Sequence, residues 1–336
     1  RMPLPYASSL AQEIIAHMKK SQYVKRIDVL GSLRRMVATV GDIDIVVLAD
    51  KKYSSQIVEH FVKFPRKTIV ENAGEKKAAI IVSPGVRIDL RVQEKKNYGS
   101  MLQYFTGSKD HNVRLREFAL QKKLSLSEWG IKQLKGKKNL LEFETEEKFY
   151  NFLGLQYIPP EIREGTIEIE SALKKNIPQL VETKDIKGDM HIHSKYNLKP
   201  SHDFGLNSYK EIIKKSNELK YEYVGFSDHN PKISGSTPEE ITKIMKTRKE
   251  YIQKNLRSTH VNYFIGLEVD ILPTGELALP QKAFEYVDYL LVSVHSAFRL
   301  DIKTMTVRVL KALNNPKVKI LGHPTGRLLG KREGYE

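Results

Sequence analysis

The sequence predicts an α/β protein in two successive parts: a small mixed sheet with flanking helices, and then a partial parallel α/β barrel. Two observations carry this prediction. A turn at Gly31-Ser32 is followed by a short strand with Asp42 and Asp44, and from about residue 188 strands alternate with helices. A chain of 336 residues is long enough for two or more domains.

The composition fits globular domains and indicates a polyanionic partner. Hydrophobic residues make up 40% of the chain, charged residues 29%, and the formal net charge is +16. Nucleic acid is the commonest partner for such a charge, although a lysine-rich solubilising surface would also account for it. The absence of cysteine excludes disulfides and thiolate metal sites and fits a cytoplasmic protein. Because the chain has no apolar run of about 18 residues, we expect no membrane span.

The elements of the first part follow from hydrophobic periodicity and turn residues. Apolar residues at helical spacing predict helices, and alternation of apolar with polar residues predicts strands. Gly31-Ser32 and Ser83-Pro84-Gly85 are typical of turns. The expected elements are a helix over 6–20, a strand over 24–30, a strand ending at Leu48, a helix over 54–64, and strands over 78–82 and 86–92.

Three carboxylates on the predicted strands indicate a metal site. Asp42 and Asp44 project to the same side of their strand because residues i and i+2 share a face. Asp89 lies on a later strand, on the opposite face from its apolar neighbours. Neighbouring carboxylates repel each other unless a cation lies between them, and oxygen ligands suit Mg²⁺ or Mn²⁺.

The turn before these carboxylates offers groups that bind phosphate. Gly31 and Ser32 supply backbone N–H groups and a hydroxyl, and Arg35 supplies a guanidinium. Together with the carboxylates, they predict a site for a metal-bound phosphate chain.

The middle of the chain is predicted to be largely helical. Asn112 and Arg116 are four residues apart on one helix and therefore share a face. Taken alone, this face is read as ordinary solvated helix surface. The expected elements are helices over 97–102, 109–122 and 140–153, followed by a charged connector over 161–183.

In the second part, each predicted strand ends in a potential metal ligand. His191 and His193 share one face, and the strand over 223–226 ends in Ser227-Asp228-His229. Because the carboxyl ends of parallel strands meet at one rim, these side chains should converge. The converging residues are His191, His193, His229, Glu268, His295 and His323.

Repetition makes this pattern specific, since a lone histidine at a strand end is usually structural. Histidine and carboxylate without cysteine suit Zn²⁺, Mn²⁺ or iron. Two or three such ions would activate water and bind phosphate, as in metal-assisted phosphoester hydrolysis. The histidines without this context are read as surface or core residues: His17, His60, His111 and His260.

Short motifs therefore stand in both halves of the chain. They are Gly31-Ser32-x-Arg34-Arg35, Gly41-Asp42-Ile43-Asp44, Arg87-Ile88-Asp89, Tyr104-Phe105-Thr106-Gly107-Ser108, His191-x-His193, Asp228-His229, Glu268, His295 and Gly322-His323-Pro324-Thr325-Gly326-Arg327. Those of the first half resemble the family X DNA polymerases, and those of the second half resemble the PHP (polymerase and histidinol phosphatase) domain. Fused in this order, they resemble the bacterial and archaeal family X polymerases.

This resemblance implies a nucleotidyltransferase-type palm, a small helical or mixed thumb and a partial PHP α/β barrel. The implied domains are a palm over 1–95, a thumb over 96–155, a linker over 156–185 and a PHP domain over 186–336. The lyase-like and fingers regions of the family are expected to be absent. The chain does not begin with Met and stops before the family's last Asp-x-His pair, so we expect a fragment with an incomplete barrel.

The resemblance also implies residue roles and partners. Asp42, Asp44 and Asp89 would be catalytic and hold Mg²⁺ or Mn²⁺, and Arg87 and Arg116 would contact DNA. Asp203 or His202 would replace a missing ligand of the PHP site, and both alternatives stay open. The implied partners are gapped or primer-template DNA and dNTP, bound by a monomer. The nucleotide would contact Gly31, Ser32, Arg35, Gly41, Tyr104, Phe105, Gly107, Ser108 and Asn112, and Mn²⁺ or Zn²⁺ would bind His191, His193, Asp203, His229, Glu268, His295 and His323.

Three functions are compatible with these features. The first is a DNA-directed DNA polymerase for repair and gap filling, with a PHP 3′→5′ exonuclease or phosphodiesterase module. The second is a PHP phosphoesterase whose first half is an inactive or regulatory module. The third is a basic nucleic-acid-binding protein with degenerate sites, which the intact carboxylate and histidine sets disfavour because binding alone does not need them.

Overall fold

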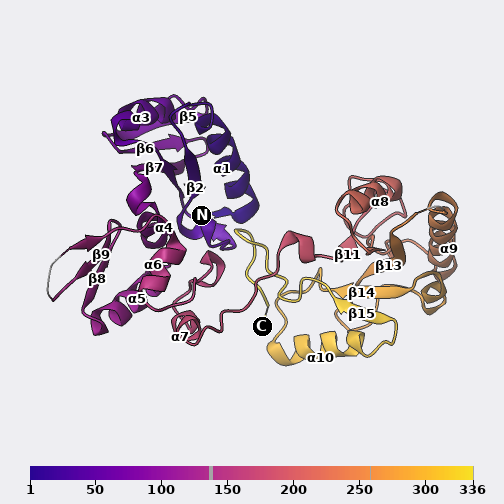
Figure 1. Cartoon of the computed structure of the whole chain (residues 1–336). Coiled ribbons are helices and arrows are strands. Elements are labelled where there is room, and N and C mark those ends of the chain that lie inside the picture. The colour runs from indigo at the N-terminus through magenta and orange to yellow at the C-terminus, as the bar shows by residue number, and fades with distance from the viewer. Residues whose placement is uncertain (136–138, 258, 336) are drawn as a thin grey trace. The chain divides into compact units, whose positions relative to one another are not determined.

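A computed structural model of the chain describes residues 1–135, 139–257 and 259–335. The chain forms two compact units, Arg1–Gln179 and Leu180–Glu336, and each is described by itself (Figure 1). Both units contain helices and strands, and the predicted α/β fold class is confirmed. Within the described ranges, no helix is long and apolar enough to cross a lipid bilayer.

The first unit is built on a five-stranded mixed sheet in the order β2-β4-β7-β6-β5, in which β4 and β7 run parallel. Ile43, Ile45 and Val47 of β4 are buried in a core that also contains Ile14 and Phe61. The sheet region consists of β1 (Met2–Pro3), α1 (Leu4–Met18), β2 (Arg26–Val29), α2 (Gly31–Arg34), β3 (Thr39–Val40), β4 (Ile43–Leu48), α3 (Ser54–Val62), β5 (Lys67–Ala73), β6 (Lys77–Val82) and β7 (Val86–Gln93).

Two features of this sheet differ from the sequence prediction. A turn and a basic connection were predicted over residues 31–35, but the structure has the short helix α2 over Gly31–Arg34. Strand β5 was not predicted, because every residue in it is exposed and its sequence shows no alternation between buried and exposed positions. It pairs with β6 at the edge of the sheet.

The thumb region packs helices against a small antiparallel sheet. Leu115, Phe149 and Tyr150 lie in its core. The helix predicted over 140–153 is wrong in its first half, because residues 140–141 form a strand and the Thr145 hydroxyl caps the helix that follows. The elements are α4 (Tyr98–Thr106), α5 (Lys109–Gln121), β8 (Leu124–Ser127), β9 (Gly130–Gln133), β10 (Leu140–Leu141), α6 (Glu146–Phe152) and α7 (Glu168–Leu173).

The segment after α6, expected to be a linker, contributes to the same core. Ile158, Ile169 and Ala172 are buried against the thumb helices. The predicted charged connector therefore contains the helix α7, whose apolar side faces inward. Because α7 and its neighbours are rich in charged residues, the sequence pattern predicted an exposed connector here.

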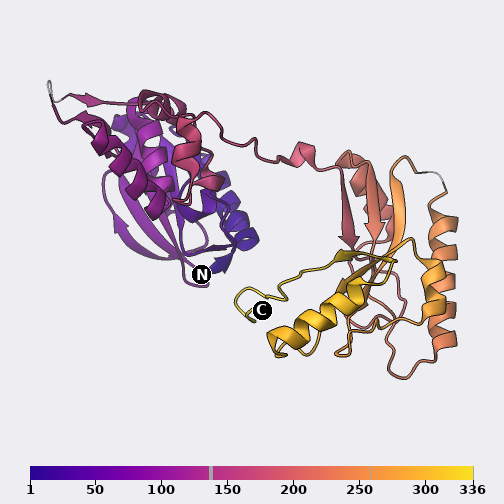
Figure 2. The ribbon, with the colours of Figure 1, turned by 90° about the horizontal axis from the view of Figure 1, so that it is seen from below.

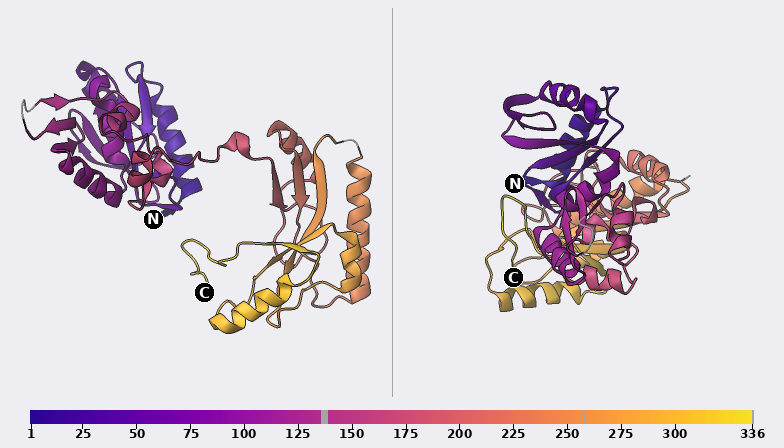
Figure 3. Two further views of the ribbon diagram at one scale, coloured as in Figure 1. Left: turned by 60° about the horizontal axis from the view of Figure 1, so that its bottom comes forward. Right: turned by 60° about the vertical axis from the view of Figure 1, so that its left-hand side comes forward.

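The second unit is a curled half-barrel of five parallel strands in chain order, β11-β12-β13-β14-β15. Figures 2 and 3 show α9 running along this sheet. Its Ile241 and Met245 pack with Leu267 and Val269 of β13. The elements are β11 (Gly188–Ile192), α8 (Tyr209–Glu218), β12 (Tyr223–Phe226), α9 (Pro238–Asn255), β13 (Asn262–Asp270), β14 (Tyr289–Ser293), α10 (Ile302–Leu313) and β15 (Val318–Leu321).

Candidate active sites

Three carboxylates converge at one end of the first sheet. Strands β4 and β7 are parallel, and their register places Asp44 directly opposite Asp89, with Asp42 just before β4. Gly31 lies against this group with a φ of +59°, and a Cβ there would lie 3.0 Å from Oδ2 of Asp44. Glycine therefore allows the turn to approach the carboxylates closely.

The carboxylates are electrostatically unequal. Burial, followed by the charges of Asp42 and Asp89, raises the pKa of Asp44 to about 6. Asp89 is compensated by Arg87, whose Nε and Nη2 donate to its two oxygens at 2.7 and 3.1 Å. Arg87, a predicted DNA contact, also lies 3.4 Å from Glu71. Asp44 is therefore the carboxylate that most needs a cation.

The predicted phosphate-binding turn lies beside the Tyr104–Ser108 segment. Nη1 of Arg35 donates to the carbonyl of Thr106 at 2.5 Å, and a Cβ on Gly107 would lie 3.2 Å from the same nitrogen. Arg35 also lies 3.5 Å from Glu164. Ser108 caps α5 by accepting a hydrogen bond from a backbone N–H. Ser32 is half-buried, and Gly41 is exposed.

The predicted base-pair contacts have partners within the unit. The Asn112 amide donates to the carbonyl of Tyr104 at 2.7 Å and accepts from Gln103 at 2.9 Å. Arg116 is exposed on α5, and Arg91 stacks 3.8 Å from the ring centroid of Phe105. Asn112 therefore links the N-terminal turn of α5 to α4.

A buried ion network that the sequence did not reveal connects the turn to the thumb. Glu146 accepts from Nη2 of Arg34 at 2.5 Å and from Nη1 of Arg163 at 2.6 Å. Arg163 is fully buried. Although burial opposes ionisation of Glu146, the two guanidinium groups hold its pKa below the usual range. Arg34 also donates to Thr106 at 2.6 Å.

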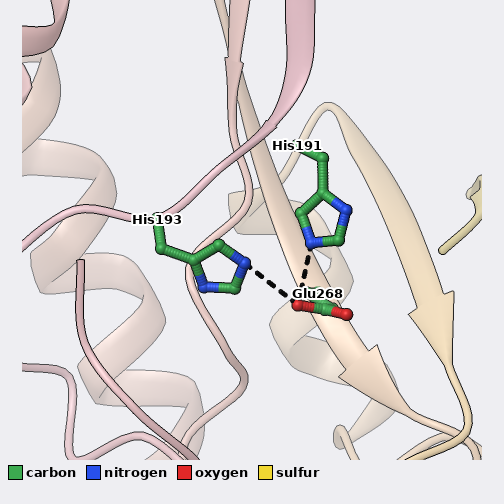
Figure 4. Close-up of side chains that lie close together, drawn as sticks. All are labelled: His191, His193 and Glu268. Atoms are coloured by element: carbon green, nitrogen blue, oxygen red, sulfur yellow. Dashed lines mark hydrogen bonds and ion pairs between the residues drawn. The ribbon is translucent and has the colours of Figure 1, made fainter. Parts of the chain in front are cut away.

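Glu268 is the centre of the second site (Figure 4). Its oxygen Oε2 lies 3.0 Å from Nε2 of His191 and 3.1 Å from Nε2 of His193. Its oxygen Oε1 lies 2.9 Å from Nε2 of His323 and 3.4 Å from Nε2 of His295. The carboxylate thus divides the imidazoles into two sets, one on each oxygen.

The donor set fits metal ions. Nδ1 of His229 is buried without a hydrogen-bond partner and lies 3.3 Å from Oε2 of Glu268. Burial lowers the pKa of His229 to about 4, which keeps its imidazole neutral, the form that binds metals. Burial would raise the pKa of Glu268, but hydrogen bonds from four histidines hold it well below the usual range.

Both alternatives for the missing ligand lie at this site. Oδ1 of Asp203 is 3.2 Å from Nε2 of His229, and the Asp203 side chain is 89% exposed. Nε2 of His202 is 3.0 Å from Oδ1 of Asp270. Asp270 was missed by sequence reasoning, although its position two residues after Glu268 on β13 was an available signal. Three groups have their ligand atoms within 4.8 Å of one another: His191, His193 and Glu268; His229, Glu268 and His295; and His202, Asp270 and His295.

Comparisons with known proteins match part of each unit to a family. Residues 101–164 match the family described as DNA polymerase beta thumb, and residues 189–323 match the PHP domain. A thumb region followed by a PHP half-barrel defines a family X polymerase architecture.

Two curated relatives narrow the class of protein that the chain resembles. The chain is 31% identical over its whole length to the DNA polymerase/3'-5' exonuclease PolX of Bacillus subtilis and covers 57% of that protein. Forty per cent of the chain is 30% identical to a probable phosphatase of Clostridium acetobutylicum, of which 52% is covered. The chain thus spans about half the length of these relatives. The chain is similar to the PolX-like family X DNA polymerases with a thumb and a PHP domain.

Proposed function

We propose that the chain carries the nucleotide-adding site of a DNA-directed DNA polymerase of family X, acting in gap filling and DNA repair. The observation that carries this proposal is the register of β4 and β7, which sets Asp44 beside Asp89 with Asp42 adjacent. Two Mg²⁺ or Mn²⁺ ions bound there would lower the pKa of an attacking hydroxyl and neutralise a leaving pyrophosphate.

The chain's own residues position the nucleotide. The N–H groups and hydroxyl of Gly31 and Ser32, with the Arg35 guanidinium, bind the triphosphate. Tyr104 and Phe105 lie against the sugar, with Gly107-Ser108 forming the turn that follows them, and Gly41 contacts the nucleotide. Asn112 approaches the nascent base pair, and Arg87 and Arg116 contact DNA.

For the second unit we propose a PHP phosphodiesterase of the 3′→5′ exonuclease type. His191, His193, Asp203, His229, Glu268, His295 and His323 would hold Mn²⁺ or Zn²⁺, which supply a nucleophilic hydroxide. The arrangement around Glu268 supports this assignment, because each carboxylate oxygen has its own set of imidazoles, and together these donors would suffice to hold more than one ion.

The proposed domains are a palm over 1–95, a thumb over 96–155 and a PHP domain over 186–336, and the connecting segment over 156–185 packs partly on the thumb core. The proposed substrates are gapped or primer-template DNA with dNTP, and we propose that the protein acts as a cytoplasmic monomer. The net charge of +16 supports a DNA partner.

The decisive experiment for the palm is Asp89→Ala, assayed by templated nucleotide addition on gapped DNA with Mg²⁺. We expect a loss larger than the about 100-fold that follows removal of an outer-shell partner of a metal. Asp50→Ala is the matched control, because Asp50 is an exposed carboxylate paired with Lys25 at 2.5 Å. Undiminished addition by Asp89→Ala, with both variants folded, would reject the polymerase assignment.

A second candidate function is a PHP phosphoesterase with an inactive palm, which the match of 40% of the chain to a probable phosphatase favours. It predicts cleavage that survives Asp42→Ala and disappears with His191→Ala, together with no nucleotide addition by the unmodified chain. The polymerase proposal predicts the same loss of cleavage in His191→Ala, but intact nucleotide addition in that variant.

A further inference from the structure

Asp270 and His295 form a close pair at the rim of the half-barrel. Nδ1 of His295 lies 2.6 Å from Oδ1 of Asp270, at the end of β13. The other ring nitrogen, Nε2, lies 3.4 Å from Oε1 of Glu268. The two nitrogens of one imidazole therefore face two different carboxylates.

The two distances have different chemical meanings. Ligands held about 2.0–2.2 Å from one tetrahedral ion lie about 3.3–3.6 Å apart. The 3.4 Å separation of His295 Nε2 and Glu268 Oε1 fits two ligands of one ion. The 2.6 Å separation of His295 Nδ1 and Asp270 Oδ1 is too short for that and fits an N–H···O hydrogen bond to a carboxylate.

We propose that Asp270 is a positioning residue, which accepts the Nδ1–H of His295 and so aims the Nε2 lone pair at the ion beside Glu268. This inference rests on the proposed metal-dependent function of the second unit. A neutral imidazole has one N–H and one lone pair, so fixing the N–H on Nδ1 also fixes the tautomer that binds metal through Nε2. His202, Asp270 and His295 are then not a separate metal site.

The fold holds both members of the pair in place. The backbone N–H of Asp270 donates to Oδ1 of Asn230 at 3.0 Å. The buried guanidinium of Arg308, on α10, donates to the carbonyls of Ile271 and Leu272 and to that of Ser296, the last at 2.9 Å. Arg308 thus ties the residues that follow Asp270 to the residue that follows His295.

His202 has a smaller part in this arrangement. Its Nε2 lies 3.0 and 3.2 Å from the two oxygens of Asp270, and its side chain is 35% exposed. These distances are those of a shared hydrogen bond from an imidazole to a carboxylate already engaged by His295. Removing His202 should leave the Asp270–His295 bond in place.

The test is titration of the metal-free full chain with Co²⁺, followed by its visible absorption, which reports both the number of bound ions and their coordination. We expect Asp270→Ala to bind as many Co²⁺ ions as the unmodified chain, with about 10- to 100-fold weaker affinity for one of them. Asp270→Asn keeps an oxygen that accepts the Nδ1–H, so it should recover most of the affinity. His202→Ala should match the unmodified chain.

The matched control is Glu276→Ala, because Glu276 is an exposed carboxylate whose partner is Lys311 at 3.5 Å. Loss of one Co²⁺ in Asp270→Asn would mean that Asp270 is itself a metal ligand and would overturn the inference. Unchanged affinity in Asp270→Ala would overturn the positioning role alone. If the unmodified chain bound no Co²⁺, the proposed function of this unit would fail as well.

Discussion

Glu146 is the residue whose change tests most sharply how the proposed phosphate-binding segment at residues 31–35 is tied to the thumb. It accepts hydrogen bonds from Arg34 at 3.1 and 2.5 Å and from Arg163 at 2.6 Å. Arg163 is 0% exposed and the Glu146 side chain 3%, so water cannot replace a lost partner. Breaking a buried ion pair on one side costs about 3–5 kcal/mol. We therefore expect Glu146→Gln to lower the free energy of unfolding of the first unit by about 4 kcal/mol.

The assay is urea or thermal unfolding followed by the fluorescence of Trp129. The chain has one tryptophan, and it lies between β8 and β9, so the signal reports the first unit. For a unit of this size, about 4 kcal/mol corresponds to a fall in Tm of about 10 °C. Glu144→Gln is the matched control, since Glu144 is exposed and 3.5 Å from Lys148, and we expect a change below about 0.5 kcal/mol.

The pH dependence gives an independent check. The pKa of Glu146 is lowered from 4.5 in the folded chain, so the stabilisation is present above pH 4.5 and is lost as the pH falls through the folded value. The difference in unfolding free energy between the unmodified chain and Glu146→Gln should therefore shrink below pH 4.5. A loss under about 1 kcal/mol at pH 7, or no shrinkage in acid, would refute the reasoning.

Two further predictions concern the carboxylate site. Because the pKa of Asp44 is raised from 3.8 to about 6, ionisation of this carboxyl destabilises the metal-free fold progressively as the pH rises between those values. We therefore expect Asp44→Asn to stabilise the metal-free chain by about 2–3 kcal/mol at pH 7.5. The same variant should abolish nucleotide addition. Equal stability of the two chains in chelator, measured by urea unfolding, would contradict this. Gly31→Ala should cost at least about 1 kcal/mol more than Gly85→Ala, because both glycines have positive φ but only Gly31 would place a Cβ against Asp44. Equal costs in thermal unfolding would show that the contact with Asp44 is relaxed without penalty.

The sequence predicted those parts of the sites that depend on local periodicity. Alternation along a strand placed Asp42 and Asp44 on one side, and the structure sets Asp89 opposite Asp44. Strand-end positions predicted that the histidines and Glu268 meet at one rim, and the structure brings them together. The catalytic and binding roles of these residues stay predictions.

Long-range pairing was not predictable in the same way. Arg34 and Glu146 are 112 residues apart, and nothing in the local pattern around either indicates the other. Arg248 and Arg308 stand among lysines on α9 and α10 and look like solvated helix charges, yet both are buried. Arg248 lies 2.6 Å from Asp228, and only the packing of helix against sheet determines which basic residue turns inward.

The two sites differ in how they balance negative charge without metal. In the first, Arg87 already neutralises Asp89 through two hydrogen bonds, so an ion must compete with a guanidinium. In the second site, the ionisable side chains paired with Glu268 are imidazoles, and a neutral imidazole can bind a metal ion. Oxygen-only donors favour Mg²⁺, and mixed nitrogen and oxygen donors favour Zn²⁺ or Mn²⁺. Under the proposed function, the second site would therefore retain ions on its own donors, whereas the first would depend more on the phosphates of a bound nucleotide.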